Sequence, residues 1–356
     1  MIPRLFPADA TTFEAIGICP LSDCISCTVE EQRNGAFTLE LEYPRDGEWV
    51  NELAIDRIVL ADPYDNAKEA EPFRIYEVEY DMNGNVMVYA NHISYQLNDV
   101  VVGKFLHTAE TPVKAWQWLE DNLLTACPFT LYSDIPARTA ATFNMAEPFK
   151  ARSYIGGMEG SILDVFGGEL EWNRWTVNLW QARGKDNSVK IAYTKNLTGL
   201  EYDVDMSNVY TGAVAYYSNN GTYVQGTLQT VTNDWSYDRT IVLDATQDFN
   251  STPTQAQLNT YALNYLNANA SAPNVSVDVE FVPLWQTEEY KQFYGLEHVS
   301  LCDTVTVLYQ PLNLSIKAKV VKTEYNVLAD RYDKITISTV KPTLADIIFG
   351  LMEGEK

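Results

Sequence analysis

Apolar and polar residues alternate along much of the chain, which is the pattern of half-buried β-strands. Between Cys24 and Tyr95 the alternating segments are short and closely spaced, at 37–43, 58–60, 73–80 and 86–89. The polar pair Asn83-Gly84 separates the last two, and glycine tolerates the positive φ that a tight hairpin requires. Many short strands with evenly spaced turns predict a barrel or a sandwich.

The hydrophobic period changes after residue 106. Thr111-Pro112 is typical of a helix start, and apolar residues follow at helical spacing, at Val113, Trp116, Leu119 and Leu123. A second short helix is expected at 161–166, because Gly167-Gly168 ends it. The alternation on both sides of Asn173-Arg174 then predicts a hairpin. An inserted α+β domain is therefore expected.

Strands are predicted again from Val189 to Thr230, with a turn at Asn220-Gly221. Next, the segment Thr252-Pro253-Thr254-Gln255 fits a capping box in which Gln255 reaches back to the N-cap. An apolar stripe predicts a core-packed helix after it, formed by Leu258, Tyr261, Ala262, Tyr265 and Leu266. From Val299 to Ser338 the pattern is that of strands, and 344–352 is expected to form a short C-terminal helix.

These patterns divide the chain into four expected parts. They are a first β-barrel at 1–106, an inserted α+β domain at 107–190, a second β-barrel at 191–341 with a helical insertion at about 236–296, and a C-terminal helix or tail at 342–356. The expected fold class is mainly β with α+β insertions.

Two distant parts of the chain resemble each other. The segment 56–60 is similar to 303–307, and 73–81 is similar to 318–326. The offset is 247 residues from Asp56 to Asp303 and 245 from Tyr80 to Tyr325, so the two blocks stay in register. Each block is followed by a turn and another alternating strand. Shared strand alternation could produce part of this similarity, but the simplest interpretation is that one chain carries two copies of a β-unit.

Alternation also assigns faces to these strands. One set of side chains is expected to face a barrel core, namely Tyr76, Val78, Tyr80, Val321, Thr323 and Tyr325. The other set is expected to face solvent, a lumen or a neighbouring subunit, namely Glu77, Glu79, Lys322 and Glu324.

The chain carries 25 basic and 48 acidic residues, a net charge of −23. Binding of nucleic acid through phosphate neutralisation is excluded as a main activity, because it needs clustered Lys and Arg. An acidic wall could still let DNA pass without retaining it. No apolar run approaches the roughly 20 residues of a membrane helix, and the N-terminal segment does not have the pattern of a leader. Neither membrane insertion nor secretion by a cleaved leader is expected.

Five cysteines are too few and too scattered to predict a disulfide framework. Cys19, Cys24 and Cys27 have a spacing seen in iron–sulfur proteins, but the remaining two, Cys127 and Cys302, lie far away in the sequence. Buried or free thiols are the favoured interpretation, and no metal or cofactor is predicted.

Three stretches, in this order along the chain, resemble the phage tail hub family, which includes the tail-associated and prophage endopeptidase tail proteins. They are the helix, Gly-Gly and hairpin of 161–182, the segment 191–213, and the strand-rich segment 299–337. A departure from the family pattern is Tyr193-Thr194, where glycine is usual. The resemblance covers about a third of the chain directly, and the order of domains fits nearly all of it.

This resemblance implies a baseplate-hub fold in which two related small β-barrels per chain form a trimeric pseudo-sixfold ring. Such a homotrimer would adapt the sixfold tail tube and the distal tail protein ring to threefold tip components. Its implied partners are the tape-measure protein and receptor-binding, tip or fibre proteins, with DNA passing through a channel without being specifically bound. The implied location is the tip or baseplate of a virion tail, assembled in the host cytoplasm.

Many members of that family continue into a C-terminal peptidase, whereas this sequence ends at Lys356, and no enzymatic activity is expected. The three histidines, at 92, 107 and 298, form no metal-ligand motif, and no nucleophile or phosphate-loop motif occurs. No catalytic residue is therefore assigned. Two alternatives stay open: a cell-wall hydrolase with an unseen carboxylate pair, and a glycan-binding adhesin that stacks sugars on Trp172, Trp175 and Trp180.

Overall fold

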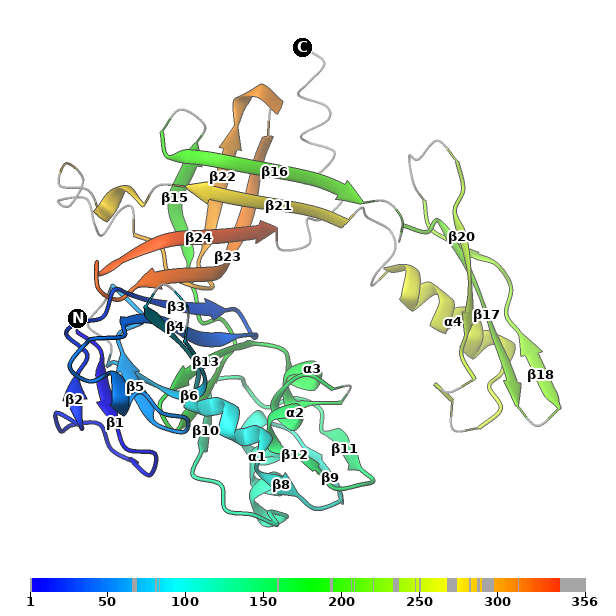
Figure 1. Cartoon of the computed structure of the whole chain (residues 1–356). Helices are drawn as coiled ribbons and strands as arrows, with labels where there is room; N and C mark the ends of the chain where they lie inside the picture. Colours follow the sequence, from blue (N-terminus) through cyan, green and yellow to red (C-terminus); the bar gives the residue numbers. More distant parts are fainter. Residues whose placement is uncertain are drawn as a thin grey trace. The chain divides into compact units, whose positions relative to one another are not determined.

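The computed structural model describes residues 2–339 except 66–68, 81, 83, 159, 193–194, 206, 208, 220, 233–236, 247, 250, 268–273, 282, 287–288, 290–297 and 313 (Figure 1). The protein is mainly β, with few and mostly short helices. It divides into two compact units. The first comprises 1–191, 280–305 and 319–337, and the second comprises 192–279, 306–318 and 338–356. The predicted helix at 344–352 lies outside the described residues.

The first unit begins with a curled antiparallel sheet. Its strands are β1 (Arg4–Phe6), β2 (Cys19–Pro20), β3 (Ser26–Gln32), β4 (Phe37–Pro44), β5 (Ile58–Ala61), β6 (Glu71–Tyr80) and β7 (Asn85–His92). They are arranged in the order β3-β4-β7-β6-β5-β1-β2. On β4 the alternate residues Leu39, Leu41 and Tyr43 are buried, as the alternation of the sequence requires. The short strands predicted between Cys24 and Tyr95 are confirmed.

The segment after β7 carries small sheets and three helices. Its elements are β8 (Val101–Val102), β9 (Phe105–Ala109), α1 (Pro112–Asp121), β10 (Thr130–Ser133), β11 (Ala141–Met145), β12 (Phe149–Lys150), α2 (Ala151–Ile155), α3 (Ile162–Phe166), β13 (Glu169–Asn173) and β14 (Thr176–Trp180). Thr111 caps α1 by accepting a hydrogen bond from the Lys114 N–H, and Ser161 caps α3 in the same way. Gly167, at φ 71°, ends α3. Both predicted helices and the β13–β14 hairpin are confirmed.

The C-terminal part of the chain repeats the strand arrangement of the N-terminal part. Its strands are β15 (Asp186–Ala192), β16 (Leu197–Asp205), β21 (Asn274–Phe281), β22 (Thr304–Tyr309), β23 (Leu314–Asn326) and β24 (Arg331–Thr339). Their order in the sheet is β16-β21-β24-β23, with β22 beside β23 and β15 beside β22 (Figure 1). In chain order these strands match β1, β3, β4, β5, β6 and β7, whose sheet order is β3-β4-β7-β6-β5-β1. The two sets therefore share one six-strand topology, and we call them the first and second repeat.

The repeats also share a backbone detail. Asp56 has a φ of 70° and Cys302 a φ of 72°, a conformation that few non-glycine residues adopt. The Asp56 N–H donates to the Ile75 carbonyl at 2.9 Å, and the Cys302 N–H donates to the Val320 carbonyl at the same distance. The return bonds, from Ile75 to the carbonyl after Asp56 and from Val320 to the carbonyl after Cys302, are both 2.8 Å. Asp56 thus corresponds to Cys302, one residue earlier than the sequence alignment with Asp303 predicts.

An additional sheet and helix lie between β16 and β21 in the sequence, where the first repeat has only the short β3–β4 loop. They are β17 (Gly212–Asn219), β18 (Thr222–Gln225), β19 (Gln229–Thr230), β20 (Thr240–Asp244) and α4 (Gln255–Tyr265). The buried residues of α4 and of β17 form one core, made of Leu258, Ala262, Leu266, Ala213, Ala215 and Tyr217. This insertion starts before the predicted 236 and ends before β21. Its capping box uses Thr254 and Gln257, two residues later than the predicted pair.

The predicted face of Tyr76 on β6 is wrong, whereas Val78 and Tyr80 lie opposite the buried Val88 and Val86 of β7 and so keep the predicted inner face. Tyr76 and Tyr80, expected in a barrel core, are 51% and 61% exposed. The pairing of β6 with β7 shifts register between Ile75 and Glu77, so Tyr76 is the extra residue of a bulge and does not point into the core. Tyr80 is exposed although it lies on the inner face, because no strand pairs with β6 on its other side there among the described residues. The corresponding position to Tyr80 in the second repeat, Tyr325, is buried as predicted.

Candidate functional site: a buried ion cluster and the edges of the repeats

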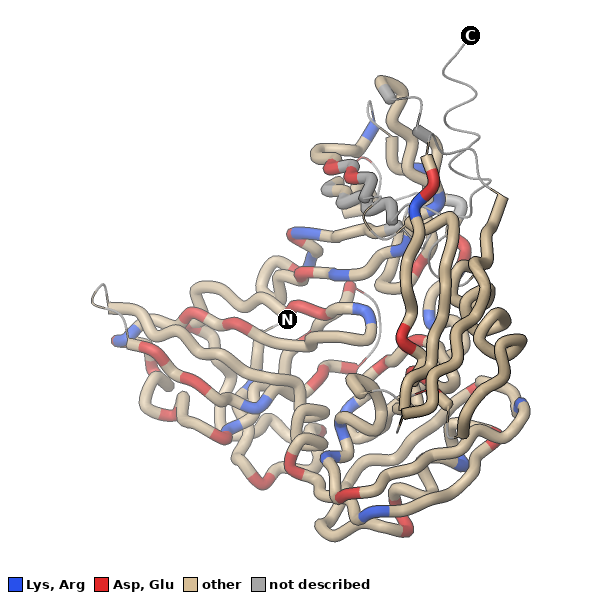
Figure 2. The backbone as a smooth tube through the Cα atoms, turned by 90° about the vertical axis from the view of Figure 1, so that its right-hand side faces the viewer, with Lys and Arg blue, Asp and Glu red and all other residues tan. Residues whose placement is uncertain are grey.

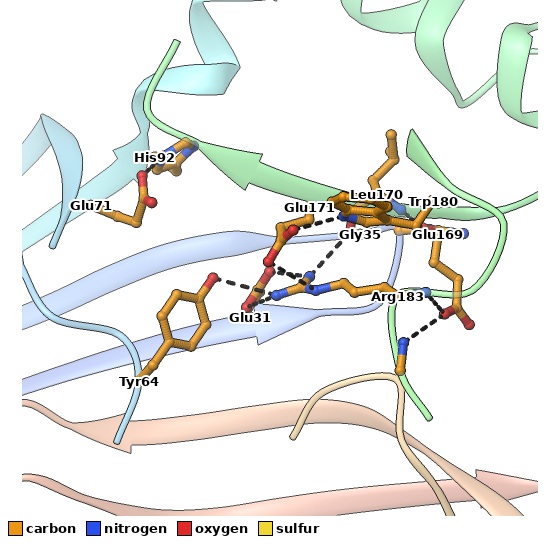
Figure 3. Close-up of polar contacts among 12 residues, drawn as sticks. Glu31, Gly35, Tyr64, Glu71, His92, Glu169, Leu170, Glu171, Trp180 and Arg183 are labelled. Atoms are coloured by element: carbon orange, nitrogen blue, oxygen red, sulfur yellow. Dashed lines mark hydrogen bonds and ion pairs between the residues drawn. The ribbon is translucent and has the colours of Figure 1, made fainter. Parts of the chain in front are cut away.

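A buried ion pair connects the first repeat to the start of the second. The Arg183 guanidinium donates to both carboxylate oxygens of Glu31 on β3, at 2.6 and 3.2 Å (Figure 3). The two side chains are only 7% and 3% exposed. Arg183 also donates to the Leu170 carbonyl and to the Tyr64 hydroxyl, and Glu171 lies 3.9 Å away. This two-pronged geometry is the strongest that an arginine–carboxylate pair makes.

A second carboxylate, Glu169 on β13, accepts hydrogen bonds from four groups, one of which is the Gly184 N–H at 3.5 Å. Arg33 donates to one oxygen at 2.9 Å, and Lys319 donates to the same oxygen at 2.5 Å. The Arg183 N–H donates to the other oxygen at 2.8 Å. We call Glu31, Arg33, Glu169, Arg183 and Lys319 the junction cluster. Its members come from β3 and the residue that follows it, from β13, from the residues that lead into β15, and from β23. The cluster therefore joins parts of the first unit that are distant in sequence.

Neighbouring groups favour the charged forms of Arg183 and Glu169. Burial alone would lower the pKa of Arg183, but the nearby carboxylate of Glu31 and the hydroxyl of Tyr64 keep it well above its ordinary value. Burial would likewise raise the pKa of Glu169, but the hydrogen bond and charge of Lys319 lower it. Permanently charged, mutually satisfied groups are suited to fixing structure and not to exchanging protons.

A neighbouring buried pair fixes the β13–β14 hairpin. Glu71 on β6 lies 3.1 Å from the His92 Nε2, and it also accepts the Arg174 N–H at 2.8 Å (Figure 3). The His92 Nδ1 accepts the Ser94 N–H, so Nε2 is the protonated nitrogen and donates to Glu71. The His92 ring stacks on Phe37 with ring centres 4.6 Å apart. His92 is therefore a hydrogen-bonded core residue.

The three tryptophans considered for sugar stacking are all occupied by packing or hydrogen bonds within the chain. Trp172 is only 4% exposed, and the guanidinium of Arg152 lies over its ring at 4.4 Å. Half-buried Trp175 donates to the Thr11 carbonyl and packs on Phe129. Trp180 donates to Glu171 at 2.7 Å. A buried ring cannot stack on a sugar, so the geometry of Trp172 supports the packing role.

The four charged residues predicted to face outward lie on equivalent strands of the two repeats. Glu77 and Glu79 on β6 are exposed, whereas Lys322 and Glu324 on β23 are half-buried. Lys322 makes ion pairs with Glu324 at 3.0 Å and with Glu30 of β3 at 2.8 Å. The β23 pair thus lies where the second repeat meets the first, while the corresponding β6 pair has no such neighbour in the described part of the chain.

No metal site is found among the described residues, where no three His, Cys, Asp or Glu side chains are arranged to hold an ion. Cys19 and Cys27 are buried, and the half-buried thiol of Cys24 donates to the Ser26 carbonyl at 3.0 Å. Burial raises the pKa of the Cys302 thiol to about 12. These observations agree with the interpretation of the cysteines as buried or free thiols. None of the described helices has the length and apolarity needed to span a membrane.

The C-terminal part of the chain is similar to a known protein family. Residues 185–348 match the family described as prophage endopeptidase tail, and the match begins beside β15, where the second repeat starts. No curated protein sequence matches the chain. The family resemblance expected from the sequence is therefore confirmed for the C-terminal part.

Solved structures of prophage tail proteins share the fold of nearly the whole chain. The prophage tail protein gp18 of Listeria monocytogenes aligns with a TM-score of 0.59 at 14% identity, over 99% of both chains. The 43 kDa tail protein of prophage MuSo2 from Shewanella oneidensis aligns at 0.56 and 10% identity, over 89% of this chain and 94% of that one. A tail protein from Neisseria meningitidis aligns at 0.55 and 9% identity, over 88% and 91%.

Proposed function

We propose that this protein is a structural hub of a phage or phage-like tail tip, in which three copies form a ring. In this role the ring adapts the sixfold tail tube and the distal tail protein ring to threefold tip components. The match to the prophage endopeptidase tail family and the fold shared with prophage tail proteins support a place in a virion tail.

The observation that carries the proposal is the six-strand topology found twice in one chain. A threefold oligomer can present six similar surfaces only if each subunit contributes two. The repeats keep the same strand order and the same positive-φ backbone turn at Asp56 and Cys302, while their sequences and insertions differ. That combination suits two β-barrels in a pseudo-sixfold ring, in which neighbouring positions are similar but not identical.

The charge of the chain suits a ring that encloses a passage. Acidic residues are spread along the chain and not gathered in one segment (Figure 2), and the net charge is −23. A negative wall repels DNA and so does not retain it. In the proposed hub, the tape-measure protein and then DNA pass through the ring, while receptor-binding, tip or fibre proteins attach outside it.

The buried carboxylates favour a structural over a catalytic role. Four buried carboxylates lie in the described part of the chain, and each one is hydrogen-bonded to another group of the same chain. Glu31 binds Arg183, Glu71 binds His92, Glu169 binds Lys319, and Asp303 accepts the Lys185 and Ser300 N–H groups at 2.9 and 3.0 Å. A general acid needs a carboxyl that can exchange a proton with substrate. These four carboxylates instead make hydrogen bonds that stabilise the fold.

The oligomeric mass of the purified full chain tests the proposal. We expect native mass spectrometry and light scattering to give three times the chain mass of 40.2 kDa. A single-chain mass at every protein concentration, or a stable assembly with a copy number other than three, would contradict the proposed hub.

A further inference from the structure

The second half of β6 has an unpaired edge. β6 pairs with β5 only from Glu71 to Arg74, and Ile75 makes the last two hydrogen bonds on that side. From Glu77 to Tyr80 the strand pairs with β7 on its other side, and no strand of the described chain pairs with its open edge. Such an edge exposes N–H and C=O groups that can accept another strand.

The second repeat shows what this edge binds when a partner is present. β23 is the counterpart of β6, and Lys322–Tyr325 corresponds to Glu77–Tyr80. On β23 this segment pairs antiparallel with β3 of the first repeat, with Lys322 opposite Gln32 and Asn326 opposite Thr28. The Arg33 N–H extends the pairing by donating to the Val321 carbonyl at 2.8 Å. Within one chain, the end of the sixth strand of one repeat therefore binds the second strand of the other.

The tyrosine on the paired strand is buried, and its counterpart on the unpaired strand is exposed. Tyr325 lies opposite Val29 of β3 and is 1% exposed. Its counterpart Tyr80 has no strand opposite and is 61% exposed. Exposed tyrosines next to an unpaired strand edge form a surface that gains apolar burial when a further strand is added.

The complementary edge is also present in the chain. β16 is the counterpart of β3 and ends the sheet order, with β21 as its one neighbour among the described strands. β3 uses its outer edge to bind β23, whereas the outer edge of β16 has no strand beside it in the described part. In the described part of each chain, the second half of β6 and the outer edge of β16 are thus both unpaired, and their counterparts β23 and β3 pair with each other.

We propose that β6 of one subunit pairs, from Glu77 to Tyr80, with the outer edge of β16 of the next subunit. This inference rests on the proposed trimer and specifies how its subunits meet. The contact between chains then repeats the β23–β3 contact within the chain, and three such contacts close the ring.

The proposed pairing brings acidic residues together. Glu77 and Glu79 on β6 and Glu201 and Asp203 on β16 are exposed, whereas the contact within the chain includes the cation Lys322. Like charges on adjacent strands repel, and salt screens that repulsion. The test is therefore carried out at high ionic strength.

Disulfide cross-linking tests the pairing directly. Glu79→Cys is combined, in the full chain, with a cysteine at each position of β16 from Leu197 to Asp203 in turn, and the purified proteins are oxidised mildly. At one or two of these positions we expect covalent dimers and trimers on a non-reducing gel. The ladder should end at three copies, because the ring closes there.

Three controls accompany the scan. Each single-cysteine variant reports cross-linking through the native thiols, and the unmodified chain reports the background. Glu30→Cys with Glu324→Cys joins residues that lie opposite each other in the β3–β23 pairing, so it should cross-link within one chain and form no ladder. The mass of every variant is measured in parallel.

The outcomes separate the two proposals. Trimers by mass with no covalent ladder at any β16 position would overturn the β6–β16 pairing and leave the hub in place. Monomers by mass at all salt concentrations would overturn the hub itself. A ladder that continues beyond three copies would contradict a closed trimer while supporting the strand pairing.

Discussion

Replacing Arg183 with alanine is expected to lower the free energy of unfolding by about 3–5 kcal/mol, because Glu31 would stay buried without its cation. The Leu170 carbonyl and the Tyr64 hydroxyl would lose a donor in the same step. Calorimetry should show the melting midpoint of the first unit falling by roughly 10 °C. No other single contact in the described chain connects β3 so directly to the residues that lead into the second repeat.

Two further variants identify the cause of this loss. Arg331→Ala removes an exposed arginine that pairs with Asp333 at 3.1 Å, and it should cost no more than about 1 kcal/mol. Glu31→Gln combined with Arg183→Met leaves neither charge buried and alone, so the double variant should be more stable than Arg183→Ala. An unchanged melting midpoint in Arg183→Ala would show that the junction cluster does not hold the first unit together.

Replacing Gly184 with alanine is expected to destabilise the protein by about 3 kcal/mol or to prevent accumulation of soluble chain. A Cβ at this position would lie 2.1 Å from the backbone carbonyl of Cys302 and 2.4 Å from the Asp303 nitrogen. Backbone atoms at such distances cannot move aside as a flexible side chain can. The Gly184 position therefore requires glycine where the chain enters the second repeat beside the Cys302 turn.

Gly103→Ala is the matched control. Its added Cβ would meet the Asn122 carbonyl at 3.4 Å, an ordinary contact, and the backbone there does not require glycine. Its melting midpoint should stay close to that of the unmodified chain. Equal stability of Gly184→Ala and Gly103→Ala would contradict the close packing of Gly184 against Cys302 and Asp303.

The local pattern of the sequence predicted most of the elements, because strands and capped helices depend on neighbouring residues. α1 begins at the predicted Thr111 cap, and α3 ends at the predicted glycine. The β6 bulge was not predictable from alternation, since a register shift depends on the partner strand. The predicted face of Tyr76 was wrong for that reason.

The junction cluster was missed because its members are far apart in sequence. Glu31 and Arg183 are separated by 152 residues, and no local pattern relates them. One signal was available. Glu31 follows Cys27 and Val29 on the same face of β3, where both neighbours are buried, so the alternation places a carboxylate in the core. A buried carboxylate requires a cation, although the sequence does not say which one.

The internal repeat was visible in sequence only over its last three strands. The shared order of all six strands emerged from the sheet topology, because the insertion between β16 and β21 separates segments that are adjacent in the first repeat. Insertions of this kind leave strand order intact while they erase the spacing that a sequence comparison needs.

Electron microscopy of the purified oligomer, viewed along its axis, tests most directly whether two repeats per chain make three chains resemble a hexagon. We predict a closed ring of three subunits with six similar lobes of two alternating kinds around a central opening. A ring whose lobes equal its subunits in number, or an oligomer without a central opening, would contradict the pseudo-sixfold hub.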